Sequence, residues 1–350
     1  MHFFVDISAH GFGHLAIAAP VLNALAEQRP GLRFTVRSAL PAAKLRQRLR
    51  TEFTHIPVAT DFGYVMHDAL TVDRAASGVA YRRAHADWAR RVAAEATFLA
   101  DLAPDVVVAN VSYLPLAGAT RAGIPAAALC SLNWADLFDH FFGDEGWAAP
   151  IHAEILAAYR AATAFLRTTP GMPMTALDNV VPVGAIAARG RRHDLGLGRG
   201  TRAVLVAMGG ITHRLPVEDW PRLPGVRWLV PAEWCCSHPD AVALESFGLS
   251  FTDLLASVDA VVTKPGYGTF TEAAANGAPL LYQRREDWPE QECLIDWLRT
   301  EARCQEIDGD LLLPGMLAPA LDRLWAMTPA APVATTGAGE AAQALLALAG

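Results

Sequence analysis

Two histidines stand among glycines near the start of the chain, in the segment Ser8-Ala-His10-Gly11-Phe-Gly13-His14. Gly11 and Gly13 permit a tight turn after an apolar run, and a helical pattern begins at about His14. A histidine at such a helix start has a pKa tilted towards the neutral form, so its imidazole can accept a proton at pH 7. The segment therefore predicts an acid–base site, with packing or capping by His10 and His14 as the alternative.

A glycine loop lies in residues 263–272, which read Thr-Lys-Pro-Gly-Tyr-Gly-Thr-Phe-Thr-Glu. An apolar run ends at Thr263 and a helix is expected to begin near Thr269, so free backbone N–H groups suit a phosphate there. Glu272, in the expected first turn, could accept both hydroxyls of a ribose. The alternative is an ordinary helix start with a Thr N-cap and a first-turn acid. The candidate ligand-binding residues of the loop are Lys264, Gly266, Tyr267, Gly268, Thr269 and Thr271.

Residues 283–291, Gln-Arg-Arg-Glu-Asp-Trp-Pro-Glu-Gln, follow the next expected strand. Arg284 or Arg285 could lie near a diphosphate, because a guanidinium pairs well with phosphate oxygens. Glu290 and Gln291 could hydrogen-bond the hydroxyls of a sugar. A charged surface loop is the alternative for this segment.

Polar or glycine residues also follow two other expected strands. Gly209 and Gly210 end the first strand of the second half of the chain and suit a phosphate. Asn133, Trp134 and Asp136 follow a strand of the first half. Trp134 could stack on a sugar face and Asp136 could assist His14 as a second catalytic group, whereas a capping Asn and a core Trp are equally compatible.

Other kinds of site find little support in the sequence. Asp308-Gly-Asp310 resembles a metal motif but is typical of a turn. No other cluster has metal-ligand spacing, so we expect neither a bound metal nor a cofactor. A Ser-His-Asp hydrolase is disfavoured because no Gly-x-Ser-x-Gly elbow is present. The five cysteines match no metal motif and indicate reduced thiols.

The elements that must position these residues follow a repeated βαβ pattern. Residues 1–8 and 32–38 are expected strands flanking a helix at 15–28, and residues 80–102 are expected to form one long helix. The pattern restarts with a strand at 202–208. The sequence thus predicts an α/β protein with two doubly wound, Rossmann-like parallel sheets facing a cleft. The expected parts are a first domain at 1–168, a linker at 169–200, a second domain at 201–335 and a final helix at 336–350.

Composition agrees with a folded protein of this size. The chain has 350 residues, 52% of them apolar and 19% charged, which suffices for two cores. Its net charge of −7 gives no sign of nucleic-acid binding. No apolar run is long enough to span a membrane and no signal peptide is evident, so we expect a cytoplasmic protein. Two basic stretches, 44–50 and 82–91, could meet an anionic acceptor or a membrane surface, or form solvated helix faces.

The motifs described so far resemble known proteins. A glycine-rich first loop, Gly209-Gly210 and a late Gly-x-Gly-x-x-x-Glu helix are similar to features of GT-B glycosyltransferases, and the last of them to the peptidoglycan N-acetylglucosaminyltransferase branch. Four segments in order resemble the glycosyltransferase-like N-terminal region of plant L-arabinokinases. These segments are His10-Gly-Phe-Gly-His14, Ser131-Leu-Asn-Trp134, Lys264-Pro-Gly-Tyr-Gly268 and Arg284-Arg-Glu-Asp-Trp-Pro-Glu290.

The resemblance implies a donor site in the second domain. Glu272 would hold the ribose, the loop at 266–269 the diphosphate, and Glu290 and Gln291 the sugar of a UDP-, dTDP- or GDP-linked donor. His14 would act as the base or support the diphosphate, and His10, Asn133 and Trp134 would lie on the acceptor side. The final helix would cross back onto the first domain, and no metal would be required. Ala9 stands where the kinase-linked relatives usually have Gly. The resemblance does not extend to a sugar-kinase domain, so we do not expect kinase activity.

The sequence predicts a glycosyltransferase with an unidentified acceptor and leaves inversion or retention open. A nucleotide-sugar hydrolase or epimerase on the same scaffold is one alternative, since water can replace an acceptor. A non-catalytic nucleotide-sugar-binding protein is another, because fold alone does not determine function.

Overall fold

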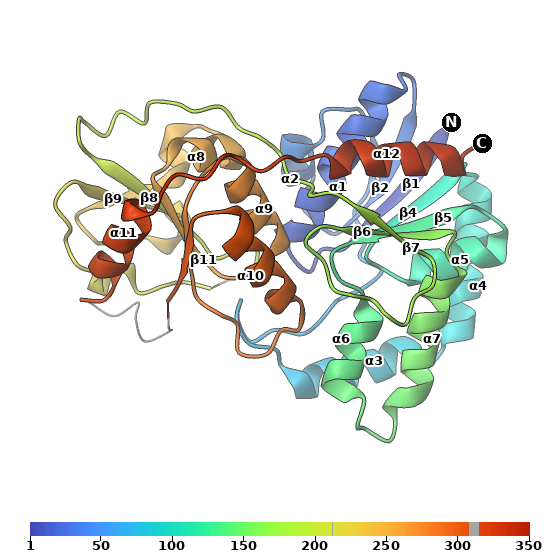
Figure 1. Ribbon diagram of the computed structural model, residues 1–350. Helices are drawn as coiled ribbons and strands as arrows, with labels where there is room; N and C mark the ends of the chain where they lie inside the picture. The colour runs from blue at the N-terminus through green and yellow to red at the C-terminus, as the bar shows by residue number, and fades with distance from the viewer. Residues whose placement is uncertain (212, 308–314) are drawn as a thin grey trace. The chain divides into compact units, whose positions relative to one another are not determined.

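The computed structural model describes residues 1–211, 213–307 and 315–350, and the chain divides into two compact units (Figure 1). Unit 1 comprises Met1–His67, Val72–Ile186 and Thr335–Gly350. Unit 2 comprises Asp68–Thr71 and Ala187–Ala334. Each unit has its own parallel sheet. The turn expected at Asp308-Gly-Asp310 lies outside the described residues.

The described part of unit 1 holds a seven-stranded parallel sheet in the order β3-β2-β1-β4-β5-β6-β7. Its first strand is buried along its whole length, as strands covered on both faces are. The strands are β1 (His2–Ile7), β2 (Arg33–Arg37), β3 (Thr54–Ile56), β4 (Val106–Asn110), β5 (Ala126–Cys130), β6 (Ala164–Thr168) and β7 (Val180–Val183).

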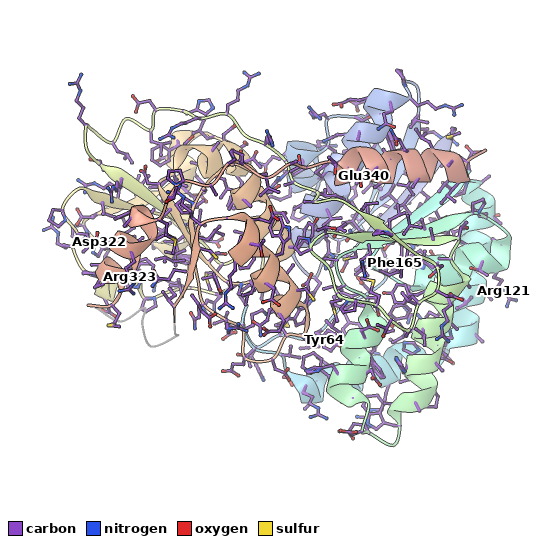
Figure 2. The ribbon with its side chains drawn as sticks, in the orientation of Figure 1. Tyr64, Arg121, Phe165, Asp322, Arg323 and Glu340 are labelled. Carbon is purple, nitrogen blue, oxygen red and sulfur yellow. The ribbon has the colours of Figure 1, made fainter. Side chains whose placement is uncertain are left out.

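The helices of unit 1 form two packed groups. Helices α2 and α12 pack against α1, whereas α4 and α7 pack against α5 (Figure 1). Glu340 of α12, labelled in Figure 2, accepts a hydrogen bond from the backbone N–H of Gly184 at 2.7 Å. The helices are α1 (Phe12–Gln28), α2 (Ala42–Arg48), α3 (Arg74–His85), α4 (Trp88–Leu102), α5 (Leu114–Ala122), α6 (Trp134–Phe142), α7 (Ala148–Ala161) and α12 (Gly337–Leu348).

The described part of unit 2 holds a six-stranded parallel sheet in the order β10-β9-β8-β11-β12-β13. Its strands are β8 (Arg202–Ala207), β9 (Val226–Val230), β10 (Ala241–Ala243), β11 (Ala260–Thr263), β12 (Leu280–Tyr282) and β13 (Cys304–Glu306). Its α-helices are α8 (Phe251–Ser257), α9 (Tyr267–Ala275), α10 (Glu290–Glu301) and α11 (Leu317–Ala326). Its short 3-10 turns are η1 (Val217–Asp219), η2 (Ala232–Trp234) and η3 (Leu244–Phe247).

The expected long helix at residues 80–102 is wrong, because two helices occupy this region. α3 begins earlier, where the side chain of Asp73 accepts a hydrogen bond from the backbone N–H of Ala76. It ends at His85, and Asp87 leaves the helical conformation with φ −123° and ψ 37° before α4 begins at Trp88. The helical pattern of the sequence runs across this break because both helices are rich in Ala and Arg.

The division between the units lies after Ile186 instead of near Thr168. Residues 180–183, assigned to the linker on sequence grounds, form β7 and pair with β6. A strand containing Pro182 is tolerated there because β7 is at the edge of the sheet, where a missing N–H leaves no ladder bond unmade.

Each sheet reverses its winding direction next to its first strand. In unit 1 this point lies between β1 and β4, where Ile7 pairs with Asn110. In unit 2 it lies between β8 and β11, where Ala207 pairs with Thr263. Ligands of doubly wound sheets bind beyond the carboxyl ends of the strands at such a point, so both places are candidate sites.

A buried ion cluster supports the site end of β1. Arg37 donates to Asp6 Oδ2 at 2.6 Å and to both carboxylate oxygens of Glu95, one of them at 3.0 Å. Its guanidinium also lies 4.8 Å from the ring centre of Phe4. Thr60 donates its hydroxyl proton to Asp6 Oδ1 at 2.8 Å. Arg37 thereby anchors β1 through Asp6, and Asp6 in turn holds the loop that carries residue 61.

Candidate functional site

His14 is a buried, uncharged base held in one tautomer. The Nδ2 group of Asn110 donates to the Leu129 carbonyl at 2.7 Å, which fixes Oδ1 as the acceptor facing the imidazole. Oδ1 lies 2.9 Å from His14 Nδ1, so Nδ1 carries the proton and Nε2 keeps its lone pair. Burial lowers the pKa of His14 to about 4, although the hydrogen bond to Asn110 opposes the shift. The imidazole is therefore neutral near pH 7 and can accept a proton at Nε2.

Trp134 contacts both histidines with its ring and donates a hydrogen bond to a carboxylate. Its buried ring lies edge-on to His10 and His14, with ring centres 5.5 and 5.9 Å away. Its indole Nε1–H donates to Asp61 Oδ2 at 2.8 Å. Burial raises the pKa of Asp61 to about 6, the charge of Asp6 adds to the rise, and the bond from Trp134 opposes it. Asp61 thus changes protonation close to neutral pH, as a carboxyl group with a proton-transfer role would.

Asp136 is placed differently from the sequence expectation. Asn133 caps α6 by accepting a hydrogen bond from the Asp136 backbone N–H at 2.8 Å. Burial raises the pKa of the Asp136 carboxyl, and the hydrogen bond with Asn133 opposes the rise. Among the described residues no hydrogen bond or ion pair joins Asp136 to His14.

Two residues of this site, Asn110 and Asp61, were not predicted from the sequence. Asn110 ends the apolar strand β4, and a polar residue directly after four apolar ones at a strand end was a readable signal. Asp61 lies in an irregular loop with no pattern around it, so only the folded structure shows its proximity to Trp134.

In unit 2, two glycine loops flank Lys264. Gly209, two residues after the end of β8, has φ +90°, which favours glycine. A Cβ atom at Gly209 would lie 3.7 Å from Lys264 Nζ, and one at Gly266 would lie 3.8 Å from it. The ammonium group is therefore close to both loops. Gly210, next to Gly209, is likewise exposed.

Helix α9 begins at Tyr267, two residues earlier than expected. Gly266 is the N-cap residue, and Phe270 N is the first to bond back, to the Gly266 carbonyl at 3.0 Å. The backbone N–H groups of the first helical turn therefore point out of the helix start, where they attract anions. Thr271 donates its hydroxyl proton to the Tyr267 carbonyl at 2.8 Å, so this donor is used within the helix.

Glu272 lies in the second turn of α9, not in the first. Its side chain is buried, with 1% of its surface exposed. The misplacement follows from the earlier helix start, because Gly266 in an extended conformation, φ −171°, replaces Thr269 as the boundary residue.

Arg285 presents a buried guanidinium with unused donors. The residue is 6% exposed, and its Nε and Nη2 atoms have no hydrogen-bond partner among the described residues. The guanidinium lies over the ring of Trp288 at 3.8 Å. Burial lowers the pKa of Arg285 to about 10, opposed by the charges of Glu290 and Asp68. A buried cation with free donors is stabilised by an incoming anion.

Burial also lowers the pKa of the second cation, Lys264. Burial lowers its pKa to about 7, the charge of Arg285 lowers it further, and Glu290 opposes the shift. An anion lying between the two side chains would raise both pKa values back towards their usual range. The arrangement is suited to bind a di-anionic group.

Glu290 and Gln291 begin α10 beside these cations. Glu290 is buried and accepts a hydrogen bond from Trp288 Nε1 at 3.1 Å. Gln291 accepts from the backbone N–H of Arg285 at 3.0 Å and donates to its carbonyl at 3.2 Å. Gln291 therefore shapes the loop that presents Arg285. Arg284, in contrast, is ion-paired with Glu306 at 2.7 Å and with Glu292.

The described residues also bear on metal binding, membrane contact and the basic stretch at 82–91. No group of three or more His, Cys, Asp or Glu side chains in that part of the chain could hold a metal ion. No described helix is long and apolar enough to cross a membrane. In the basic stretch at 82–91, Arg90 pairs with Asp87 at 2.6 Å and Arg91 donates to the Ala84 carbonyl at 2.6 Å.

Comparison with known proteins adds to this geometry. No family model matches the chain. The chain is 26% identical over 343 residues to L-arabinokinase of Arabidopsis thaliana, covering 92% of this chain and 32% of that protein. It thus spans about a third of the length of that curated relative.

Solved structures resemble the whole described fold. The glycotransferase of kitacinnamycin matches with a TM-score of 0.63 and 16% identity, covering 100% of this chain and 96% of that one. Glycosyltransferase VinC in complex with dTDP matches at 0.58 and 16%, covering 100% and 95%. The UDP-GlcNAc 2-epimerase of Methanocaldococcus jannaschii matches at 0.54 and 10%, covering 99% and 100%. With its two doubly wound parallel-sheet units, the chain has the GT-B fold of glycosyltransferases.

Proposed function

We propose that this protein is a glycosyltransferase that takes a sugar from a nucleoside-diphosphate donor bound by unit 2. The observation that carries the proposal is the pair of partly or fully buried cations, Lys264 and Arg285, at the carboxyl ends of β11 and β12. Two buried positive charges close to one another destabilise the empty site unless an anion compensates them. A diphosphate supplies that charge, and the start of α9 supplies backbone donors to it.

Within this proposal the donor has three contact regions. The diphosphate lies against Lys264, the Gly209 loop and the start of α9. Glu290 hydrogen-bonds the sugar, and Glu272 the ribose. The base of the nucleotide is left to experiment, with UDP-, dTDP- and GDP-sugars as the candidates, and VinC offers a neighbour with bound dTDP.

His14 is the general base for the acceptor in this proposal. An acceptor hydroxyl gives its proton to His14 Nε2, and its oxygen forms a bond to the anomeric carbon of the sugar. The bond between that carbon and the diphosphate oxygen breaks, and the diphosphate leaves with the electron pair. Lys264 and Arg285 stabilise the charge on the leaving group, which is how such sites lower the barrier. His14 then releases its proton to solvent.

Replacing Arg285 or Lys264 with Met is expected to weaken the binding of UDP, dTDP or GDP by about 10- to 100-fold. The reason is that a hydrogen bond to a charged group contributes about 1.5–3 kcal/mol. Titration calorimetry measures the effect. Arg284→Met is the matched control: it removes the same charge from the same loop, but Arg284 is already ion-paired, so binding should hold within about twofold. Equal losses in all three variants would show a general charge effect and contradict the proposed site.

The affinity for a nucleoside diphosphate should also fall as the pH rises above about 7. Lys264 has a pKa of about 7 in the free protein, so it is mostly charged at pH 6 and mostly neutral at pH 8. A bound diphosphate favours the charged form, and binding therefore takes up a proton at the higher pH. Calorimetry in buffers of different ionisation enthalpy measures this uptake. Lys264→Met should bind without it, and uptake that persists in this variant would assign the proton to another group.

A nucleotide-sugar epimerase or hydrolase is the second candidate, favoured by the likeness to the UDP-GlcNAc 2-epimerase. Incubation with nucleotide-sugars distinguishes a hydrolase, an epimerase and a non-catalytic binding protein from a glycosyltransferase. Release of free nucleotide without an acceptor supports a hydrolase, and a changed sugar still attached to nucleotide supports an epimerase. Binding without turnover, with every acceptor tried, supports a binding protein.

A further inference from the structure

A short loop from the N-terminal half of the sequence belongs to unit 2. The antiparallel bridge between Met66 and Val72 closes this loop. Asp68 Oδ1 accepts hydrogen bonds from the backbone N–H groups of Leu70, at 2.7 Å, and Thr71, at 2.9 Å. Leu70 packs against the hydrophobic core of unit 2. The loop is therefore a folded turn with Asp68 at a defined position.

The second oxygen of Asp68 lies beside the segment that follows β8, next to the proposed donor site. Asp68 Oδ2 lies 3.8 Å from His213 Nδ1, and His213 follows the Gly209-Gly210 loop after β8. Asp68 also lies near enough to Arg285 for its charge to act on the guanidinium, although no hydrogen bond between them is found in the described part of the chain. One carboxylate thus lies close to a residue that follows β8, and its charge also acts on a residue that follows β12.

We propose that Asp68 is a donor-site residue whose carboxylate competes with the diphosphate of the ligand for Arg285 and His213. The inference rests on the proposed function, because it assigns Asp68 to the same site. The negative charge of Asp68 already lies beside these residues before a ligand binds. A diphosphate has to outweigh it, so Asp68 sets the affinity at a lower value than the cations alone would give.

The charge of Asp68 can be removed without removing its turn. An Asn side chain keeps the oxygen that accepts from Leu70 N and Thr71 N, so Asp68→Asn retains the loop. Because the Asp68 side chain is 40% exposed, its attraction for the cations is partly screened by solvent. We therefore expect Asp68→Asn to raise the affinity for inorganic pyrophosphate by about three- to fivefold. The gain should shrink in high salt.

The test is calorimetric titration of the whole chain with pyrophosphate, and separately with a panel of nucleotide-sugars. Asp101→Asn is the control, since it removes one negative charge from an exposed position of α4 in unit 1. Tighter pyrophosphate binding by Asp68→Asn alone supports the inference. Unchanged or weaker binding overturns it, as does an equal gain in Asp101→Asn or an absence of pyrophosphate binding in both Asp68→Asn and the unaltered chain.

The two arms separate this inference from the proposed function. If Asp68→Asn binds pyrophosphate more tightly but no nucleotide-sugar binds, the competition is real and the glycosyltransferase proposal fails. If nucleotide-sugars bind and are turned over while Asp68→Asn binds pyrophosphate like the unaltered chain, the function stands and the role of Asp68 is excluded. Circular dichroism and a thermal melt of Asp68→Asn establish that the variant is folded.

Discussion

His14→Gln is expected to lower the rate of sugar transfer by about 10²- to 10⁴-fold, the contribution that a positioned general base makes. Gln can still donate to Asn110 Oδ1, but it has no lone pair basic enough to take the acceptor proton. The donor contacts proposed here belong to unit 2, so the affinity for a nucleoside diphosphate should not change. The measurements are the turnover rate, with donor and acceptor saturating, and calorimetric binding of the nucleoside diphosphate.

Asp61 is the competing candidate for the base, because its pKa of about 6 is closer to neutral pH than that of His14. Asp61→Asn keeps an oxygen that accepts from Trp134 Nε1 and so keeps the ring in place. If Asp61 only positions Trp134, this variant should retain most of the activity. A loss in Asp61→Asn that exceeds the loss in His14→Gln, together with disappearance of an activity limb near pH 6, would transfer the role of base to Asp61.

Arg37→Met is expected to destabilise unit 1 by about 3–5 kcal/mol, the usual effect of removing one partner from a buried ion pair. Arg37 is 5% exposed and bonds two buried carboxylates, those of Asp6 and Glu95. Without the guanidinium, these carboxylates are left close together in a site that excludes water. Hydrogen exchange at the amides of β1 and β2 reports the loss for unit 1 separately from unit 2.

A surface pair provides the control for Arg37. Arg50 and Glu27 are 2.8 Å apart, with side chains 73% and 65% exposed, so Arg50→Met should change stability by less than about 1 kcal/mol. Adding Asp6→Asn and Glu95→Gln to Arg37→Met should restore part of the lost stability, since the uncompensated charges are then gone. A loss as small as that of Arg50→Met would show that water reaches the cluster and compensates its charges.

The sequence alone predicted the fold class. Parallel β-strands buried on both faces produce continuous apolar runs, and glycines and polar residues mark where those runs end. For this reason His10 to His14, Gly209-Gly210 and the loop at 263–272 could be located at strand ends, and the resemblance of these segments led to the GT-B fold that the structure shows. Periodicity is less informative at helix boundaries, which is why the break before Trp88 and the start of α9 at Tyr267 were missed.

Only the tertiary structure decided the protonation states and the partners of the candidate catalytic and binding groups. The protonation state of His14 depends on burial and on Asn110, 96 residues away, and that of Lys264 on burial beside Arg285. Asp61 and Asp68 lie in loops without any periodic pattern, and their neighbours come from distant strands. A pKa and a partner are set by which groups the fold brings within a few ångströms, and local sequence does not contain that information. The sequence thus predicted at which strand ends the candidate residues lie, and the folded chain determined which of their side chains are charged, neutral or paired.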